Sequence, residues 1–107
     1  MNHFVDLNAA AQFAADKMRK NNLFTTERMF CDVYCFEPGQ AQSAHAHAGS
    51  DKVYVVLDGL AHIQIGDEER EAPAGTAALA PAGVAHGVRN PGPGRVTVLV
   101  FMAPKPT

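Results

Sequence analysis

From residue 38 onward, glycine and proline recur about every eight to twelve residues and divide the sequence into short runs. The runs are alternately or continuously apolar, which is typical of β-strands. They lie at residues 29–36, 52–57, 60–65, 70–72, 76–80, 84–88 and 96–102. Because glycine and proline stand at the joints and not inside the runs, this spacing predicts an all-β sandwich or barrel.

Before these strands we expect a single short helix, over residues 6–20. Apolar side chains recur there at three- and four-residue steps from Leu7 to Met18. Asp6 or Asn8 can cap the start of such a helix. The apolar stripe consists mostly of alanine, so we expect this helix to lie against the barrel without forming a core of its own.

The chain length allows one domain with one core. It has 107 residues, of which 47% are hydrophobic and 19% charged, as in folded globular proteins. We therefore expect a single domain over residues 1–107. It would comprise an N-terminal helical segment to about residue 22, a barrel over 23–103 and a short tail over 104–107.

Charge and hydropathy exclude several classes of partner. The net charge is −2, so the basic surface of a nucleic-acid-binding protein is missing. No apolar run approaches the roughly 20 residues of a membrane-spanning helix, and no membrane partner is expected. The N-terminus carries Asp6 and no basic segment, unlike a signal peptide. We therefore expect a cytoplasmic protein.

Three of the five histidines fall in two short segments, and two of them form a His-x-His pair. His45 and His47 would point to the same face of an extended chain. Their Cα atoms would then be roughly 6.5–7 Å apart, which lets both imidazoles reach one ion at about 2.0–2.1 Å each. A single histidine is more often an ordinary surface or core residue than a ligand, so the pair alone leaves ligation open.

Two longer motifs resemble those of the cupin family. GQAQSAHAHAGSDKVYVVLDG, residues 39–59, resembles the first cupin motif, with a glycine, five residues, His-x-His, an acidic residue after a short gap, and a closing glycine. GTAALAPAGVAHGVRN, residues 75–90, resembles the second, with a glycine, five residues, Pro-x-Gly, two residues, a histidine, three residues and an asparagine. The linker over residues 60–74 is as short as in compact single-domain cupins.

The resemblance implies a jelly-roll β-barrel, or double-stranded β-helix, that holds a metal ion in its interior. It assigns His45, His47 and His86 as the three imidazole ligands. The cofactor implied is one divalent metal ion, Fe, Mn, Ni or Zn. Imidazole nitrogens do not select strongly among these ions.

One position departs from the family pattern. The carboxylate ligand implied by the resemblance should lie seven residues before Gly59, where this chain has Lys52. In one alternative a bulge turns the neighbouring Asp51 inward, which gives a site of three histidines and one carboxylate. In the other, three histidines and water hold the metal. Because a dication would repel a buried ammonium, we expect Lys52 to point away from the metal or to bind an anionic group of a ligand.

Strand parity places Tyr54, Val56, His62 and Gln64 as further candidates to line the same cavity, although ordinary barrel filling explains most of them equally well. His62 and Tyr54 are the candidates for proton transfer. His62 can equally be an exposed ring.

The resemblance implies chemistry on a small molecule. We expect a dioxygenase, lyase or isomerase acting on a small oxygen-rich or anionic substrate, whose oxygens the metal would polarise. The alternative is a non-catalytic, metal-containing module that binds or senses a small ligand. The resemblance also implies a homodimer, with the N-terminal helix and the strand over residues 24–36 as the interface.

Overall fold

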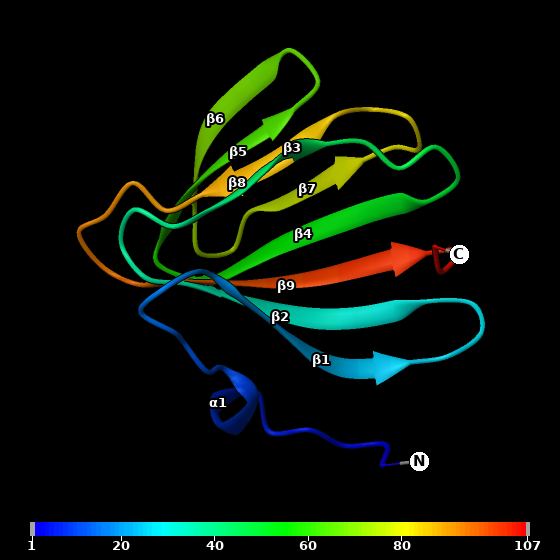
Figure 1. The fold of residues 1–107 in the computed structure, drawn as a ribbon, viewed down its shortest axis with the longest axis horizontal. Helices are drawn as coiled ribbons and strands as arrows, with labels where there is room; N and C mark the ends of the chain where they lie inside the picture. The colour runs from blue at the N-terminus through cyan, green and yellow to red at the C-terminus, as the bar shows by residue number, and fades with distance from the viewer. Residues whose placement is uncertain (1, 107) are drawn as a thin grey trace.

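The chain folds into two antiparallel sheets that pack face to face (Figure 1). The structure is a computed structural model that describes residues 2–106. The five-stranded sheet has the order β1 (Arg19–Thr25), β2 (Phe30–Phe36), β9 (Val96–Ala103), β4 (Asp51–Asp58) and β7 (Ala77–Ala80). The four-stranded sheet has the order β3 (Ala41–His45), β8 (His86–Arg89), β5 (Leu60–Ile65) and β6 (Glu68–Pro73). The predicted all-β jelly-roll class is confirmed.

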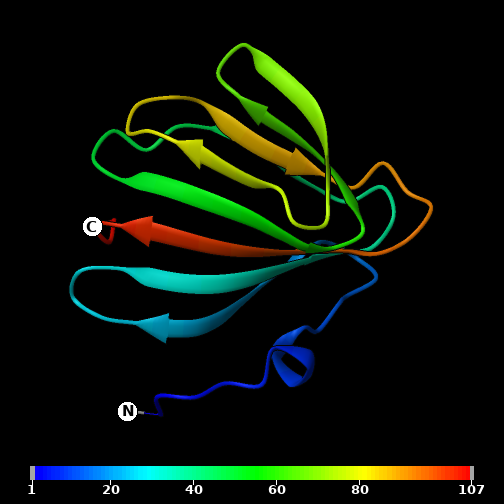
Figure 2. The same ribbon diagram turned by 180° about the vertical axis from the view of Figure 1, so that it is seen from behind.

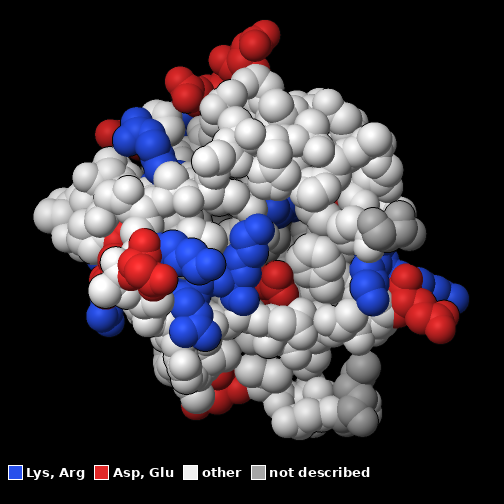
Figure 3. Space-filling view, in the orientation of Figure 1, with Lys and Arg blue, Asp and Glu red and all other residues white. Residues whose placement is uncertain are grey.

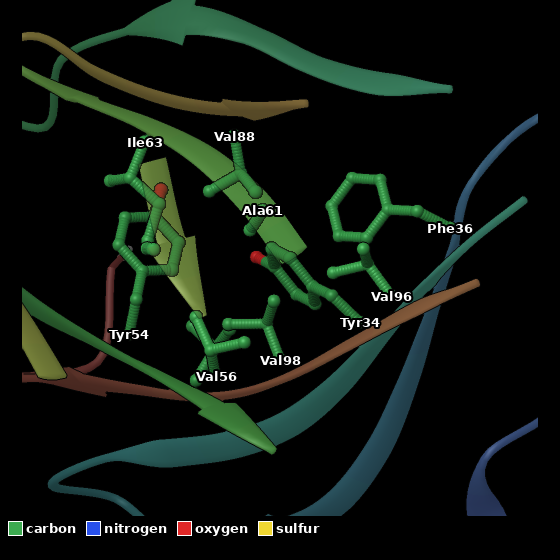
Figure 4. Packing of buried hydrophobic residues seen from close by; sticks show 11 residues of the cluster. Tyr34, Phe36, Tyr54, Val56, Ala61, Ile63, Val88, Val96 and Val98 are labelled. Carbon is green, nitrogen blue, oxygen red and sulfur yellow. The ribbon is translucent and has the colours of Figure 1, made fainter. Parts of the chain in front are cut away.

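The core fills the space between the two sheets. Side chains alternate along each strand, so every second residue points inward. Figure 4 shows Tyr34 and Tyr54, from the five-stranded sheet, facing Ile63 and Val88 of the other sheet. These four side chains are at most 3% exposed. The strand expected over residues 29–36 is β2, whose inner face carries Tyr34 and Phe36 and which is buried on both faces from Cys31 to Phe36.

The predicted helix over residues 6–20 is wrong in extent. The helix α1 is a single turn, Leu7–Ala10, and Asp6 caps it by accepting a hydrogen bond from the backbone N–H of Asn8 at 3.0 Å. Residues 19–25 form β1 instead, which pairs with β2 from Phe30 to Cys35. A short alanine-rich helix gains little from packing, whereas β1 satisfies the backbone groups at the edge of β2. Figure 2 shows α1 on the β1 side of the molecule.

The start of the barrel differs from expectation, and the tail is held by hydrogen bonds. The barrel begins at Arg19 and not at residue 23, because β1 belongs to the five-stranded sheet. In the tail, the backbone N–H of Lys105 donates to the carbonyl of Arg28 at 3.1 Å, and Ser50 Oγ donates to the carbonyl of Pro104 at 2.7 Å. Residues 1 and 107 lie outside the described residues. Within the described part of the chain, no helix has the length and apolar character needed to cross a membrane.

Gly59 makes the turn that carries the chain from β4 to β5, and so from one sheet to the other. Its φ angle is +83°, and a Cβ atom there would lie 2.2 Å from the carbonyl oxygen of Arg95. Both the backbone conformation and the close approach require glycine. This turn sets β5 and β8 opposite β4, which closes the barrel around the histidines.

Candidate metal centre

The three motif histidines lie at one end of the four-stranded sheet. His45 is the last residue of β3, His47 follows it in the next loop, and His86 is the first residue of β8. His45 and His86 are cross-strand partners, and the register of β3 against β8 shifts between Gln42 and His45. This irregularity in β3 brings the His-x-His pair against the start of β8.

The imidazoles converge as a metal site requires. Ring centroids are 4.6 Å apart for His45 and His86, 4.8 Å for His45 and His47, and 5.6 Å for His47 and His86. One nitrogen of each ring lies within 4.8 Å of the others. Nitrogens bound to one tetrahedral ion are roughly 3.4 Å apart, so small side-chain rotations would complete the site.

Hydrogen bonds at the far side of two rings fix which nitrogen faces the centre. Nδ1 of His86 lies 3.0 Å from the carbonyl of Val84, and Nδ1 of His45 lies 2.8 Å from the carbonyl of Ser43. Because a carbonyl can only accept, each Nδ1 donates, and each Nε2 then carries a lone pair.

Nε2 of His86 is buried and has no hydrogen-bond partner among the described residues. A buried polar atom without a partner is costly, and a metal ion would satisfy it. The described residues therefore fit a divalent ion held by three imidazole nitrogens.

The local environment favours neutral imidazoles, which are the form that binds metal. Burial lowers the pKa of His86, and the nearby ammonium of Lys52 lowers it further. Burial also lowers the pKa of His47, with further lowering from His45 and Lys52.

The structure does not bring Asp51 to this centre. Its side chain is exposed, and Oδ1 accepts a hydrogen bond from the backbone N–H of Ala82 at 2.9 Å. Asp51 thereby connects the start of β4 to the turn after β7. Among the described residues, the grouped ligands are the three histidines without a carboxylate.

Lys52 takes the interior position instead, and the expectation that it points away from the metal or binds an anionic group of a ligand stays a prediction. Its side chain is 1% exposed, and Nζ lies 5.1 Å from the ring centroid of Tyr34 and 5.2 Å from that of Tyr54. Burial lowers the pKa of its ammonium to about 8, and Lys20 contributes to the lowering. The strand has no bulge at this point that would exchange Lys52 and Asp51, since both pair in register with β9.

Of the two proton-transfer candidates, Tyr54 faces the interior of the barrel and His62 faces outward. Tyr54 is fully buried in the interior, with its ring centroid 6.1 Å from that of His86. His62 lies on the outer face of β5, where Nε2 is 3.8 Å from Oε1 of Glu69. The expectation that His62 lines the metal cavity is therefore wrong, and Gln64 shares its outer face. Ala61 and Ile63 occupy the inner face of β5.

Two interior residues that the sequence did not single out are Gln42 and Tyr34, and Gln42 connects Tyr34 to Tyr54. Gln42 on β3 accepts a hydrogen bond from the hydroxyl of Tyr54 at 3.0 Å, and its Nε2 donates to the hydroxyl of Tyr34 at 3.4 Å. The inward parity of Tyr34 on β2 could have indicated its place. The polar, alanine-rich sequence around Gln42 gave no comparable signal.

A cavity of about 520 Å³ opens beside His45 and His47. Its lining includes His45, His47, Lys52, Lys20, Asp32 and Tyr34. Figure 3 shows a hollow near the middle of one face of the molecule, with basic side chains beside it and an acidic one close by. This volume is in the usual range for small-molecule sites.

Gly87, next to His86, allows β3 to approach β8 closely. A Cβ atom at Gly87 would lie 3.0 Å from the carbonyl oxygen of Gln42 and 3.1 Å from backbone atoms of Ala44. The absence of a side chain at this position therefore determines how near the irregular part of β3 lies to His86.

Comparison with known proteins agrees with this fold. A crystal structure of a Thermus thermophilus protein matches with a TM-score of 0.94 and 45% identity, over 98% of this chain and 100% of that one. A double-stranded β-helix protein from Klebsiella pneumoniae matches with a TM-score of 0.90 and 22% identity, over 97% and 91% of the two chains. An uncharacterized Streptomyces coelicolor protein is 34% identical over 83 residues, which are 77% of this chain and 78% of that protein. The family model for the cupin domain matches residues 32–102, so the chain belongs to the cupin family.

Proposed function

We propose that this protein is a metal-dependent enzyme that converts a small oxygen-containing molecule inside the barrel, by lyase or isomerase chemistry. The observation that carries this proposal is the buried, unpartnered Nε2 of His86, which lies in a group with His45 and His47. A cavity of about 520 Å³ beside the rings of His45 and His47 leaves space for a substrate.

The charge of the site favours reactions that develop negative charge on a substrate oxygen. A divalent ion held there would act as a Lewis acid that polarises a carbonyl or hydroxyl oxygen. Three neutral imidazoles do not reduce the charge of such an ion, and Lys52 adds a further cation to the same interior. Proton abstraction next to a carbonyl, as in isomerisation or elimination, benefits most from this environment.

The interior side chains divide the proton-transfer roles. Burial raises the pKa of Tyr54, so its hydroxyl stays protonated and is held by Gln42 as a donor. Asp32 supplies the carboxylate of the described cavity lining, and its Oδ1 accepts a hydrogen bond from Nδ2 of Asn22 at 2.8 Å. We therefore infer that Asp32 replaces His62 as the proton acceptor.

The test is hydrogen exchange in deuterated water, followed by proton NMR, on a panel of small hydroxy and oxo compounds. Protein loaded with Zn²⁺, Mn²⁺ or Fe²⁺ should exchange or convert at least one compound, and the metal-free protein should not. His86→Ala serves as the inactive control and His62→Ala as the matched active one.

Three other results would contradict the proposal. A strict requirement for O₂ with Fe²⁺ would indicate a dioxygenase. Binding of a panel compound without turnover would favour a non-catalytic ligand-binding module. Protein that takes up none of these ions would refute the proposal, because the reaction requires a bound metal.

A further inference from the structure

Two lysines in the cavity have no part in holding a metal. Nζ of Lys52 lies 5.1 Å and Nζ of Lys20 lies 5.4 Å from the ring centroid of Tyr34. We propose that Lys52 and Lys20 form a carboxylate-binding subsite, so that the substrate is a small organic acid. Its carboxylate would bind the lysines, and a separate oxygen would face the three imidazoles. This inference rests on the proposed function, because it assumes that the imidazole centre receives the same molecule.

Lys52 has the properties of a residue that lacks its counter-ion. Its side chain is 1% exposed. Within residues 2–106, the ion pairs are those of His62, Arg70 and Arg95, and Lys52 belongs to none of them. Burying an ammonium without a paired anion is costly. An anionic group of a ligand would remove this cost.

The charges around the subsite match one carboxylate. Lys52 and Lys20 supply two positive charges, and Asp32 supplies one negative charge to the same cavity. The carboxylate of Asp32 is already bound by Asn22. The remaining single positive charge complements a monoanionic carboxylate better than a dianionic phosphate.

Tyr34 provides a neutral donor at the same place. Its hydroxyl oxygen accepts from Gln42, whose amide is oriented by the hydrogen bond from Tyr54. The proton of Tyr34 is therefore left free to bind a ligand. Burial raises the pKa of this hydroxyl to about 12, so it remains a donor.

The subsite is close enough to the imidazoles for one small molecule to reach both. The ring of Tyr54 lies 5.2 Å from Nζ of Lys52 and 6.1 Å, between centroids, from the ring of His86. Lys52 and His86 are thus separated by no more than the sum of these two distances. A short oxo acid, with its keto oxygen a few carbons from its carboxylate, fits this separation.

The experiment measures binding of 4-oxopentanoate and of its uncharged methyl ester to the zinc-loaded protein by calorimetry. Wild type should bind the acid more tightly than the ester. Lys52→Met, which keeps the volume of the side chain, should weaken binding of the acid by at least about tenfold and leave the ester unchanged. Lys20→Met should have a smaller effect in the same direction. Lys17→Met, the same change at an exposed lysine outside the cavity, is the matched control.

Zinc content and thermal unfolding are measured on every variant. These measurements distinguish failure of the proposed function from failure of the carboxylate subsite. If wild type takes up no zinc, the proposed function fails. If it takes up zinc but the acid does not bind, or binds equally to wild type and Lys52→Met, the carboxylate subsite alone is refuted. If Lys52→Met does not fold, the same binding measurements are made on Lys20→Met and Lys52→Gln. If both variants prefer the acid over the ester as strongly as wild type does, the inference is overturned.

Discussion

His45 and His86 are cross-strand partners whose imidazoles are held in the same way. Each Nδ1 lies close to the carbonyl of the residue two positions earlier in the chain, Ser43 for His45 and Val84 for His86. The ring centroids are 4.6 Å apart. Because both Nδ1 atoms are occupied, both Nε2 atoms are free for one shared ligand. The pairing of β3 and β8 therefore organises two-thirds of the proposed metal site before any ion binds.

His86→Ala should remove most of the bound metal. Losing a residue that merely orients a ligand costs roughly 10–100-fold in affinity, so losing a ligand should cost more than about 100-fold. Elemental analysis of protein purified without added ions measures the effect. His45→Ala and His47→Ala should behave alike. His62→Ala and Asp51→Ala are the controls and should retain the metal; a loss in Asp51→Ala would show that its carboxylate is a ligand after all.

Metal should be released as the pH falls below the usual range of histidine. Burial lowers the pKa of His47 and of His86 from 6.5, so protons compete with the metal only below that value. The protein should hold its metal at about pH 6.5 and lose it in more acidic buffer. A chromophoric zinc indicator follows the release. Retention at about pH 4.5 would contradict neutral imidazole ligands.

Lys52→Met should stabilise the metal-free protein at neutral pH. In the folded state the pKa of Lys52 is about 8, below its ordinary 10.5. Between these values the unfolded chain binds a proton that the folded chain does not, so the free energy of unfolding of wild type rises with pH across this window. Below it, the folded protein bears the full cost of the buried charge.

The free energy of unfolding of Lys52→Met should therefore exceed that of wild type by up to about 3 kcal/mol below pH 8. This difference should shrink as the pH approaches 10.5. Urea unfolding of both proteins across this range gives the difference directly. Lys17→Met should show no such trend. A difference that does not change with pH would mean that the ammonium of Lys52 is well solvated.

Gly59→Ala should destabilise the fold far more than Gly39→Ala. Both glycines have positive φ angles, +83° and +87°, so both substitutions introduce about 1–2 kcal/mol of backbone strain. At Gly59 the new Cβ would also collide with the carbonyl of Arg95, whereas nothing lies within 4 Å of a Cβ at Gly39. Urea midpoints measure the two effects, and equal losses would show that the turn at Gly59 can relax.

The homodimer expected from the sequence stays a prediction. Val5 and Leu7 of the N-terminal segment line an apolar depression with Met29 and Phe101 on the outer face of the five-stranded sheet. Phe101 is 36% exposed. If a second copy covers this face, Phe101→Glu should convert a dimer to a monomer in light scattering, and His62→Ala, on the other sheet, should not. A monomeric wild type would refute the dimer.

The sequence predicted the barrel and the pairing of His45 with His47 because both depend on local spacing. Glycine and proline mark where strands end, and the His-x-His pair must share a face on any extended chain. His86 needed the resemblance to a known motif, since nothing local to it indicates that β8 pairs with β3.

The remaining site residues depend on tertiary structure. Strand parity left His62 open between the cavity and the surface, although the apolar pair Ala61 and Ile63 indicates that His62 lies on the outer face. The choice between Asp51 and Lys52 follows from the regular register of β4 against β9, which the sequence does not reveal. Residues 19 and 20, expected at the end of the helix, belong to β1 because the edge of β2 needs a partner.

The lack of a side chain at Gly87 extends the metal site beyond its ligands. An added methyl group would meet the backbone of Gln42 and Ala44 at 3.0–3.1 Å, so β3 would have to move by a few tenths of an ångström. Metal–ligand distances tolerate only about 0.2 Å. A mutational survey scored on metal retention should therefore find Gly87 as intolerant of change as the histidines. The single hydrogen atom of Gly87 therefore sets how closely β3 can approach the proposed ligand His86.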